Sequence, residues 1–263
     1  MRKPVPQPAR PSPAQLISPR LRTATGLGIG VCALAVILLG VLVAGRRGPT
    51  GLDSAVWRVL PYPWGPAGQQ GAGRLFLAAV GHISDLGAPL AITVLTAALC
   101  CCCLALRRYR AAIMVVGAEI SASVLTRGMK PVFDRTIGGS TSYPSGHTTA
   151  AFALGAAFVL VLASSRTSWI PARLRIALSV LTLATAALVG LGMVAWREHY
   201  LTDTFGGAAV GIGAALAVAL FVDLVAERRH RREPARRPAP DAGPVTAVTA
   251  KSSGLFSTPN SPP

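Results

Sequence analysis

The stretch TFGGAAVGIGAALAVALFVDLVA, at residues 204–226, decides the fold class of this chain. It contains a single charged residue, Asp223, and as a helix it is long enough to cross a hydrocarbon core about 30 Å thick. Five more apolar stretches predict membrane helices at residues 25–45, 86–106, 111–126, 147–164 and 176–196. We therefore expect an all-α, polytopic membrane bundle of about six transmembrane helices.

The composition of the whole chain agrees with this class. Hydrophobic residues make up 51% of the 263 residues and charged residues only 14%, and the mean hydropathy is +0.50. The net charge of +16 raises the question of a nucleic-acid partner. However, only 6% of the residues are aromatic, and the basic residues lie between and outside the apolar stretches. Membrane topology explains the excess of positive charge better, so no nucleic-acid partner is expected.

The five cysteines indicate neither a disulfide framework nor a metal site. Cys32 and the run from Cys100 to Cys103 all lie inside apolar stretches rather than in loops. Consecutive residues of a helix point about 100° apart, so the run cannot surround one metal ion. Small-residue helix packing is the favoured interpretation of this run, and no cofactor or metal is expected.

The distribution of the 26 Lys and Arg residues predicts the orientation in the membrane. Most of them lie before the first stretch, after the sixth, or in the two connections on that same side, which places both termini in the cytoplasm. The first stretch resembles a signal peptide, but its apolar core exceeds the roughly 7–15 residues of a cleaved signal, so it is interpreted as a retained helix. We expect disordered tails at residues 1–24 and 228–263 around a membrane domain at 25–227. The oligomeric state is left open.

Two of the four histidines lie at helix boundaries on the outside face. His147 ends the sequence YPSGH, in which a proline turn runs directly into the fourth predicted helix. The N–H groups of a helix start carry partial positive charge, so Ser145, Gly146 and His147 offer a site for an anion. Glycine also permits the close backbone approach that a phosphate oxygen needs.

The second histidine, His199, lies in the sequence WREHYLTD. Asp203 follows it by four residues, so the two side chains meet if this turn is helical. A carboxylate on one imidazole nitrogen makes the other nitrogen a better nucleophile. Lys130 and Arg135, which follow the third apolar stretch, would supply positive charge for a phosphate.

These motifs resemble the type 2 phosphatidic acid phosphatase superfamily, which is related to the vanadium haloperoxidases. Its motifs are Lys, six residues, Arg-Pro; then Pro-Ser-Gly-His; then Ser-Arg, five residues, His, three residues, Asp. This chain has the second motif complete at residues 144–147, the core of the third at His199 and Asp203, and the start of the first at Lys130. The resemblance covers roughly the third to sixth helices.

The resemblance implies a role for each matched residue. His199 would attack phosphorus to give a phosphohistidine, His147 would protonate the leaving oxygen, and Asp203 would orient His199. Lys130, Ser145 and Gly146 would bind the phosphate.

The chain departs from the family pattern at two arginines. Ile137 stands where the first motif has arginine, and Met193 stands where the third motif has arginine. Arg135 and Arg197 are the nearest cations, and we predict that they bind the phosphate instead. Ordinary loop charges are the alternative interpretation of both residues. If they bind phosphate, replacing either by alanine should lower phosphatase activity by orders of magnitude.

The expected function is a metal-independent membrane phosphatase, with the active site on the extracytoplasmic side. Phosphatidic acid, phosphatidylglycerol phosphate and polyprenyl phosphates or diphosphates are the candidate lipid substrates, and the sequence does not choose among them. A lipid phosphotransferase would use the same histidines. A lipid-phosphate-binding protein without turnover is a third possibility, although such a protein has no need for a nucleophile.

Overall fold

The computed structural model describes residues 15–164 and 167–232. The helices and strands in chain order, with η marking 3-10 helices, are η1 (Pro19–Leu21), α1 (Arg22–Val43), α2 (Gly51–Val59), α3 (Pro66–Gln69), α4 (Gly71–Ser84), η2 (Asp85–Gly87), α5 (Pro89–Ala105), α6 (Tyr109–Phe133), β1 (Thr136–Ile137), β2 (Ser140–Thr141), α7 (Gly146–Ala163), α8 (Ala172–Ala195) and α9 (Leu201–Arg232).

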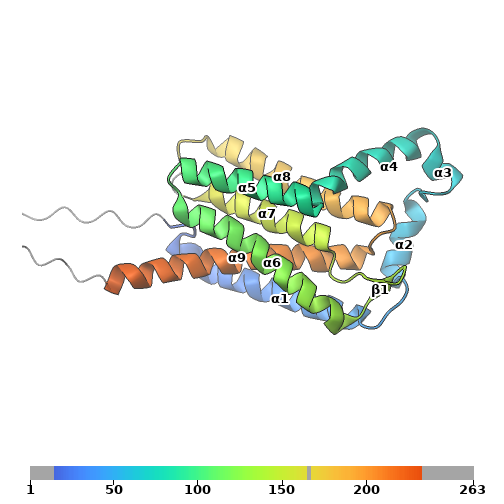
Figure 1. Cartoon of the computed structure of the whole chain (residues 1–263), viewed down its shortest axis with the longest axis horizontal. Coiled ribbons are helices and arrows are strands. Elements are labelled where there is room, and N and C mark those ends of the chain that lie inside the picture. The colour runs from blue at the N-terminus through green and yellow to red at the C-terminus, as the bar shows by residue number, and fades with distance from the viewer. Residues whose placement is uncertain (1–14, 165–166, 233–263) are drawn as a thin grey trace, which may run out of the picture.

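The long helices form one elongated bundle (Figure 1). Within the described residues, α1, α6, α7, α8 and α9 are each long and apolar enough to cross a membrane. The α4 and α5 helices meet at 58° across a short break and count as a sixth crossing if taken together. The predicted all-α bundle of about six membrane helices is therefore confirmed. The second predicted crossing, at residues 86–106, corresponds to η2 and α5, and the bend lies where α4 joins α5.

Helices α7 and α9 pack along each other, and the rest of the bundle surrounds them. Helix α1 lies against α9, α6 lies against both α7 and α9, and α8 lies against α7. The close approach of α7 to α9 depends on glycine. A Cβ atom on Gly207 would lie 2.7 Å from the Ser145 carbonyl oxygen, and one on Gly211 would lie 2.4 Å from that of Thr149. Small residues thus allow α7 and α9 to pack closely.

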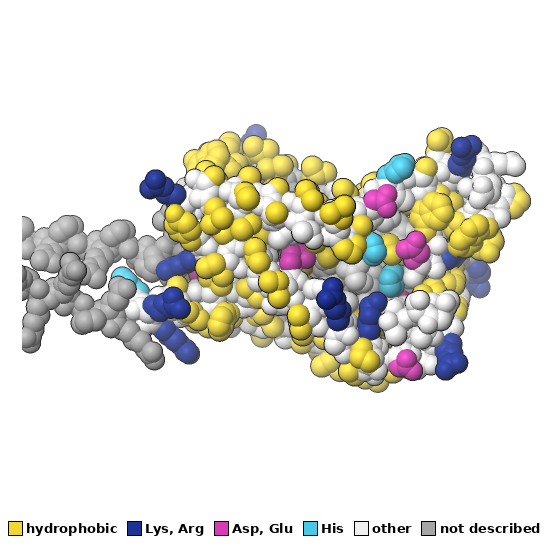
Figure 2. Space-filling model, in the orientation of Figure 1, with side chains coloured by type: hydrophobic (Ala, Val, Ile, Leu, Met, Phe, Trp, Pro, Cys, Tyr) yellow, Lys and Arg dark blue, Asp and Glu magenta, His cyan; other side chains and the backbone are white. Residues whose placement is uncertain are grey.

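The outward faces of the bundle are apolar. On α1, the side chains of Leu27, Val31 and Val41 are each about two-thirds exposed. Figure 2 shows hydrophobic side chains covering most of the visible bundle surface, with Lys and Arg gathered toward its two ends. Such a surface is stable against lipid tails rather than water, so these exposed residues belong to the membrane-facing perimeter.

Both described ends of the chain lie at the same end of the bundle (Figure 1). The backbone N–H groups of Leu16 and Ile17 donate to the Asp223 carboxylate at 2.9 and 2.8 Å, and Arg22 forms an ion pair with Glu227. Both Leu16 and Ile17 are buried. The predicted tail boundaries need correction, because the ordered structure begins before residue 24 and α9 continues to Arg232. Residues 1–14 and 233–263 of the predicted tails lie outside the described residues.

Residues 46–85, between the first two predicted crossings, contain three helices, α2, α3 and α4. In Figure 1 these helices cover the end of the bundle opposite to the chain ends. The third predicted crossing also continues two turns further than expected, since α6 ends at Phe133 with Pro131 inside it. Lys130 is therefore a helical residue rather than a loop residue.

Candidate active site

The third motif forms the turn between α8 and α9. The imidazole Nδ1 of His199 lies 3.5 Å from Oδ2 of Asp203, and both residues are buried. Asp203 lies in the first turn of α9, where its Oδ2 also accepts a hydrogen bond from the backbone N–H of Tyr200 at 3.1 Å. One carboxylate therefore caps the start of α9 and also faces the histidine. Because Nδ1 faces Asp203, Nε2 is the nitrogen left for chemistry.

The second motif forms the start of α7, directly beside this turn. Ser145 is the residue before the helix, and its Oγ accepts from the Thr148 backbone N–H. Its own N–H donates to the Asp203 carbonyl oxygen at 3.1 Å, which joins the starts of α7 and α9. His147 is half-buried in the first turn of α7. The bond from Ser145 to Asp203 brings His147 close to the turn that carries His199.

Ser145 does not match the phosphate-binding role predicted for it. It is fully buried, its Oγ lies 3.0 Å from Thr148 Oγ1, and its N–H is already used by Asp203. Ser145 therefore holds the two helix starts together. Gly146, the first residue of α7, is half-exposed, so its N–H lies at the positive end of the helix dipole and keeps its predicted role.

The first motif ends in a short hairpin that returns the chain toward α7. Strands β1 and β2 pair antiparallel, and the connecting Gly138 and Gly139 have φ values of 55° and 84°. Such left-handed pairs make the two-residue turns that suit a hairpin. The ammonium of Lys130 donates to the Thr141 carbonyl oxygen at 3.1 Å, and its charge acts on His147. An ammonium has three donors, so Lys130 retains donors for a phosphate.

Arg135 lies away from the opening of the site. It is fully buried, and its Nη1 donates to Asp203 Oδ1 and Thr202 Oγ1, each at 2.5 Å. Its Nη2 donates to Asp53 Oδ2 at 2.7 Å, and its guanidinium lies 4.0 Å from the centre of the Tyr200 ring. This geometry favours a structural role over the predicted phosphate contact, because Arg135 is fully buried and each of its terminal nitrogens bonds a carboxylate. Arg135 instead holds Asp203 in place.

Asp53 is the residue that sequence reasoning missed. It lies in α2, is fully buried, and accepts from Arg135 and from the backbone N–H of Thr202 at 3.0 Å. The Thr50 and Asp53 side chains also form a capping box that starts α2. The sequence carried a signal for this cap, since Thr50 and Asp53 have the spacing of such a box. Nothing in the sequence indicated that the same carboxylate reaches the third motif.

The stability of the protein should fall in acid as Asp53 becomes protonated. Burial alone raises the pKa of this carboxyl, but hydrogen bonds from the Thr202 and Thr50 backbone N–H groups and from Arg135 outweigh burial and hold the pKa below its usual 3.8. Because this pKa is lower in the folded state, the stabilisation is complete above the usual pKa. It is lost as the pH falls through the folded-state pKa.

The measurement is the melting temperature of the purified protein in detergent, from neutral pH down to about pH 2. Asp53→Asn should melt lower than the unmodified protein at neutral pH and should lose less on acidification. If acidification lowers the melting temperature of Asp53→Asn as much as that of the unmodified protein, other carboxylates cause the acid sensitivity.

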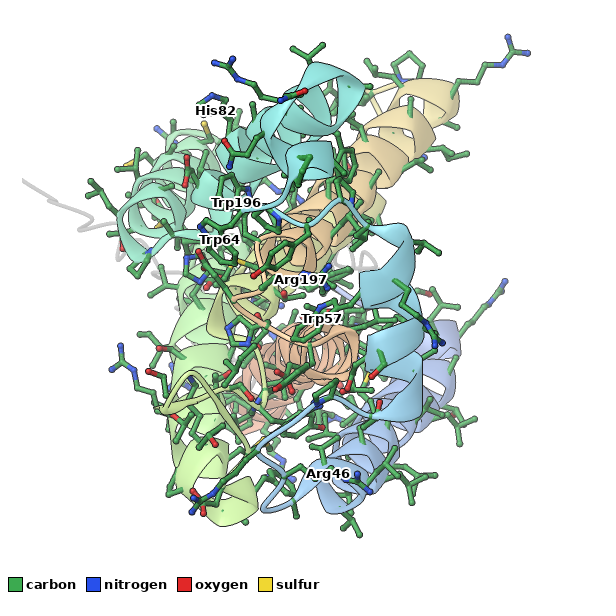
Figure 3. The ribbon with its side chains drawn as sticks, turned by 90° about the vertical axis from the view of Figure 1, so that its right-hand side faces the viewer. Arg46, Trp57, Trp64, His82, Trp196 and Arg197 are labelled. Atoms are coloured by element: carbon green, nitrogen blue, oxygen red, sulfur yellow. The ribbon has the colours of Figure 1, made fainter. Side chains whose placement is uncertain are left out.

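Arg197 anchors α2 to the turn after α8. Its backbone is left-handed, with φ of 63°, and its Nη2 donates to the Trp57 carbonyl oxygen at 2.7 Å. Its guanidinium also lies 4.6 Å from the centre of the Trp57 ring, and Figure 3 shows these two labelled residues side by side. The Trp57 ring in turn stacks on Tyr200 at 5.0 Å. This packing fits the alternative of a structural role for Arg197 better than the predicted phosphate contact.

Apolar side chains occupy both positions where the family motifs have arginine. Ile137 is half-buried in β1, and Met193 is buried near the end of α8. Of the three cations predicted to bind phosphate, Lys130 is the one whose position fits that role. The site therefore combines two histidines, one oriented by a carboxylate, with a lysine and a helix start.

Comparisons with known proteins agree with this arrangement. Residues 123–226 match the family model described as the PAP2 superfamily, a region that runs from α6 through α9 and contains all three motifs. The chain is 35% identical over 100 residues to Lipid phosphate phosphatase 2 of Arabidopsis thaliana, a match that covers 37% of this chain and 33% of that protein. It thus spans about one third of the length of this curated relative.

A solved structure shows the same fold. It is described as the crystal structure of the first transmembrane PAP2 type phosphatidylglycerolphosphate phosphatase from Bacillus subtilis. The TM-score is 0.56 at 16% identity, and the alignment covers 78% of this chain and 98% of that one. Together with the helices, this match supports a multi-pass integral membrane protein.

Proposed function

We propose that this chain, which carries a PAP2 superfamily region at residues 123–226, is a membrane enzyme that removes phosphate from a lipid. The observation that carries the proposal is the position of His199, with Nδ1 facing the buried Asp203 and His147 nearby at the start of α7. A histidine held in this way is suited to nucleophilic attack. The relatives named above, a lipid phosphate phosphatase and a phosphatidylglycerolphosphate phosphatase, support a lipid substrate.

The reaction proceeds in two displacements. In the first, Nε2 of His199 forms a bond to phosphorus, the bond to the leaving oxygen breaks, and His147 gives that oxygen a proton. In the second, a water molecule gives a proton to His147 and attacks the phosphohistidine, which releases inorganic phosphate and restores His199. Lys130 and the N–H of Gly146 stabilise the phosphoryl oxygens in both steps. Arg135 keeps Asp203 in place for both.

The site faces the extracytoplasmic side in this proposal, with both termini in the cytoplasm. The described chain ends and the site lie at opposite ends of the bundle (Figure 1), as this topology requires. The distribution of Lys and Arg along the sequence indicates which end of the bundle faces the cytoplasm. A lipid headgroup at the outer surface then reaches His199 while its tails remain in the bilayer.

The test uses the full chain in detergent micelles with phosphatidic acid and with phosphatidylglycerol phosphate, in the presence of a chelator. Release of inorganic phosphate, absent in His199→Ala, is the expected result. A phosphotransferase would release no free phosphate, and adding an acceptor alcohol would yield a phosphorylated acceptor instead. Binding of either lipid without any phosphate release would support the non-catalytic alternative and reject the proposal.

A further inference from the structure

A cavity of about 370 Å³ opens beside His147. Its wall includes His82 in α4, Asp85 in η2, Met193 and Trp196 at the end of α8, and Glu198 in the following turn. Neither His199 nor Lys130 belongs to this wall. The cavity therefore lies on the proton donor's side of the site, apart from the nucleophile and the phosphate-binding lysine.

The geometry of phosphoryl transfer assigns this cavity to the leaving group. In an in-line displacement, the attacking atom and the leaving oxygen lie on opposite sides of phosphorus. If His199 attacks and His147 protonates the leaving oxygen, as the proposed function holds, the leaving group extends past His147. The cavity is lined by His147 and not by His199, which fits a leaving group on that side.

The charges around the cavity are negative. Asp85 and Glu198 are exposed, and both carboxylates act on the charge of His147. No Lys or Arg is among the described residues that line it. His82 lies beside Asp85, with Nδ1 4.0 Å from Asp85 Oδ2. Figure 2 shows histidine and acidic side chains close together toward this end of the bundle.

Apart from Ser84, whose hydroxyl donates to the Val80 carbonyl oxygen at 2.7 Å, the remaining wall is apolar or aromatic. Trp196 uses its indole N–H to donate to the Leu77 carbonyl oxygen at 3.1 Å, so this donor is not available to a ligand. Met193 offers no charge. Figure 3 labels Trp196 and His82, and both lie near α4. The cavity thus presents acceptors and apolar surface to whatever leaves with the oxygen.

We propose that this cavity receives a neutral leaving alcohol, so that the enzyme acts on lipid phosphomonoesters and discriminates against lipid diphosphates. The leaving group of a diphosphate is itself a phosphate, and its negative charge would lie beside Asp85 and Glu198. Like charges repel, and solvent reduces this repulsion at the two exposed carboxylates without removing it. The leaving group of a phosphomonoester is a neutral alcohol, such as a glycerol headgroup. A hydroxyl group on this alcohol can donate a hydrogen bond to the carboxylates. Asp85 and Glu198 are therefore specificity residues of the proposed reaction.

The test compares farnesyl phosphate with farnesyl diphosphate, which share one tail and differ only in the leaving group. Initial rates of phosphate release are measured with the full chain in detergent, with a chelator present so that no metal neutralises the diphosphate. We expect the monoester to react at least about tenfold faster. Glu198→Gln and Asp85→Asn should each raise the ratio of diphosphate to monoester rates by about tenfold.

Asp134→Asn is the matched control. Asp134 is an exposed carboxylate at the end of α6, outside the cavity wall, and its φ of 44° is a conformation that asparagine also tolerates. This variant removes one negative charge from the site end of the bundle and should leave the rate ratio unchanged.

Three results would overturn the inference. Diphosphate hydrolysed as fast as the monoester would reject the discrimination. A rate ratio that does not move in Glu198→Gln and Asp85→Asn, or moves equally in Asp134→Asn, would reject the assignment to these carboxylates. In both cases phosphate release that requires His199 would leave the proposed function standing. No release from either ester would instead reject the proposed function, and the inference with it.

Discussion

Replacing His199 by alanine is expected to abolish phosphate release from every ester tested, a fall of roughly 10⁴–10⁶-fold in kcat. Without this imidazole no phosphohistidine forms, and neither Asp203 nor His147 can take its place as the attacking group. The measurement is release of inorganic phosphate from a lipid phosphate and from p-nitrophenyl phosphate. If His199→Ala melts at a temperature close to that of the unmodified protein, the loss of activity is due to the missing imidazole and not to unfolding.

The matched variant His147→Ala should behave differently with the two esters. A general acid contributes roughly 10²–10⁴-fold when the leaving group is a poor one, such as a lipid alcohol. The p-nitrophenolate group leaves without a proton, so its release should fall much less. Equal losses on both esters would contradict the role of His147 as proton donor, and substantial activity of His199→Ala would contradict the nucleophile.

The second large effect is expected at Arg135. Arg135→Met would leave the buried carboxylates of Asp53 and Asp203 facing each other without a cation, at a cost of about 3–5 kcal/mol in the free energy of unfolding. Most of the activity should be lost with the fold. Denaturation in detergent measures this cost, and the double variant Arg135→Met with Asp53→Asn should recover part of it, because one of the two unpaired charges is removed.

Arg135→Lys separates positioning from phosphate binding. A lysine keeps one positive charge in place but cannot bridge two carboxylates as a guanidinium does. We expect kcat to fall about 10–100-fold while KM stays close to its original value, because Arg135 acts on the reaction through Asp203. A rise in KM with kcat preserved would return Arg135 to the phosphate-binding role that the sequence suggested.

The sequence predicted the bundle well because membrane helices are encoded locally. Each crossing requires a long apolar stretch, and such stretches are visible without knowledge of their neighbours. The ends of the helices were predicted less accurately. The extra turns of α6 carry Arg127 and Lys130, so the apolar stretch ends before them. The backbone nevertheless continues as a helix to Phe133.

The candidate site was predictable only where its residues are close in sequence. The spacing of His199 and Asp203 follows from one helical turn, and the structure places them as expected. Arg135 was misassigned because its partners are not local. Asp53 lies 82 residues before it, and Asp203 lies 68 residues after it. A nearby cation in the sequence is indistinguishable from a phosphate ligand until its buried partners are known.

The contact between α2 and the third motif has a consequence for how this domain evolves. Asp53 lies before the region that defines the superfamily, yet its carboxylate bonds Arg135 and Thr202 inside that region. A segment exchange that imports residues 123–226 from a relative without its own α2 would separate these partners. The two pieces are thus expected to be inherited together, and chimeric enzymes should tolerate a crossover before Thr50 better than one after Val59.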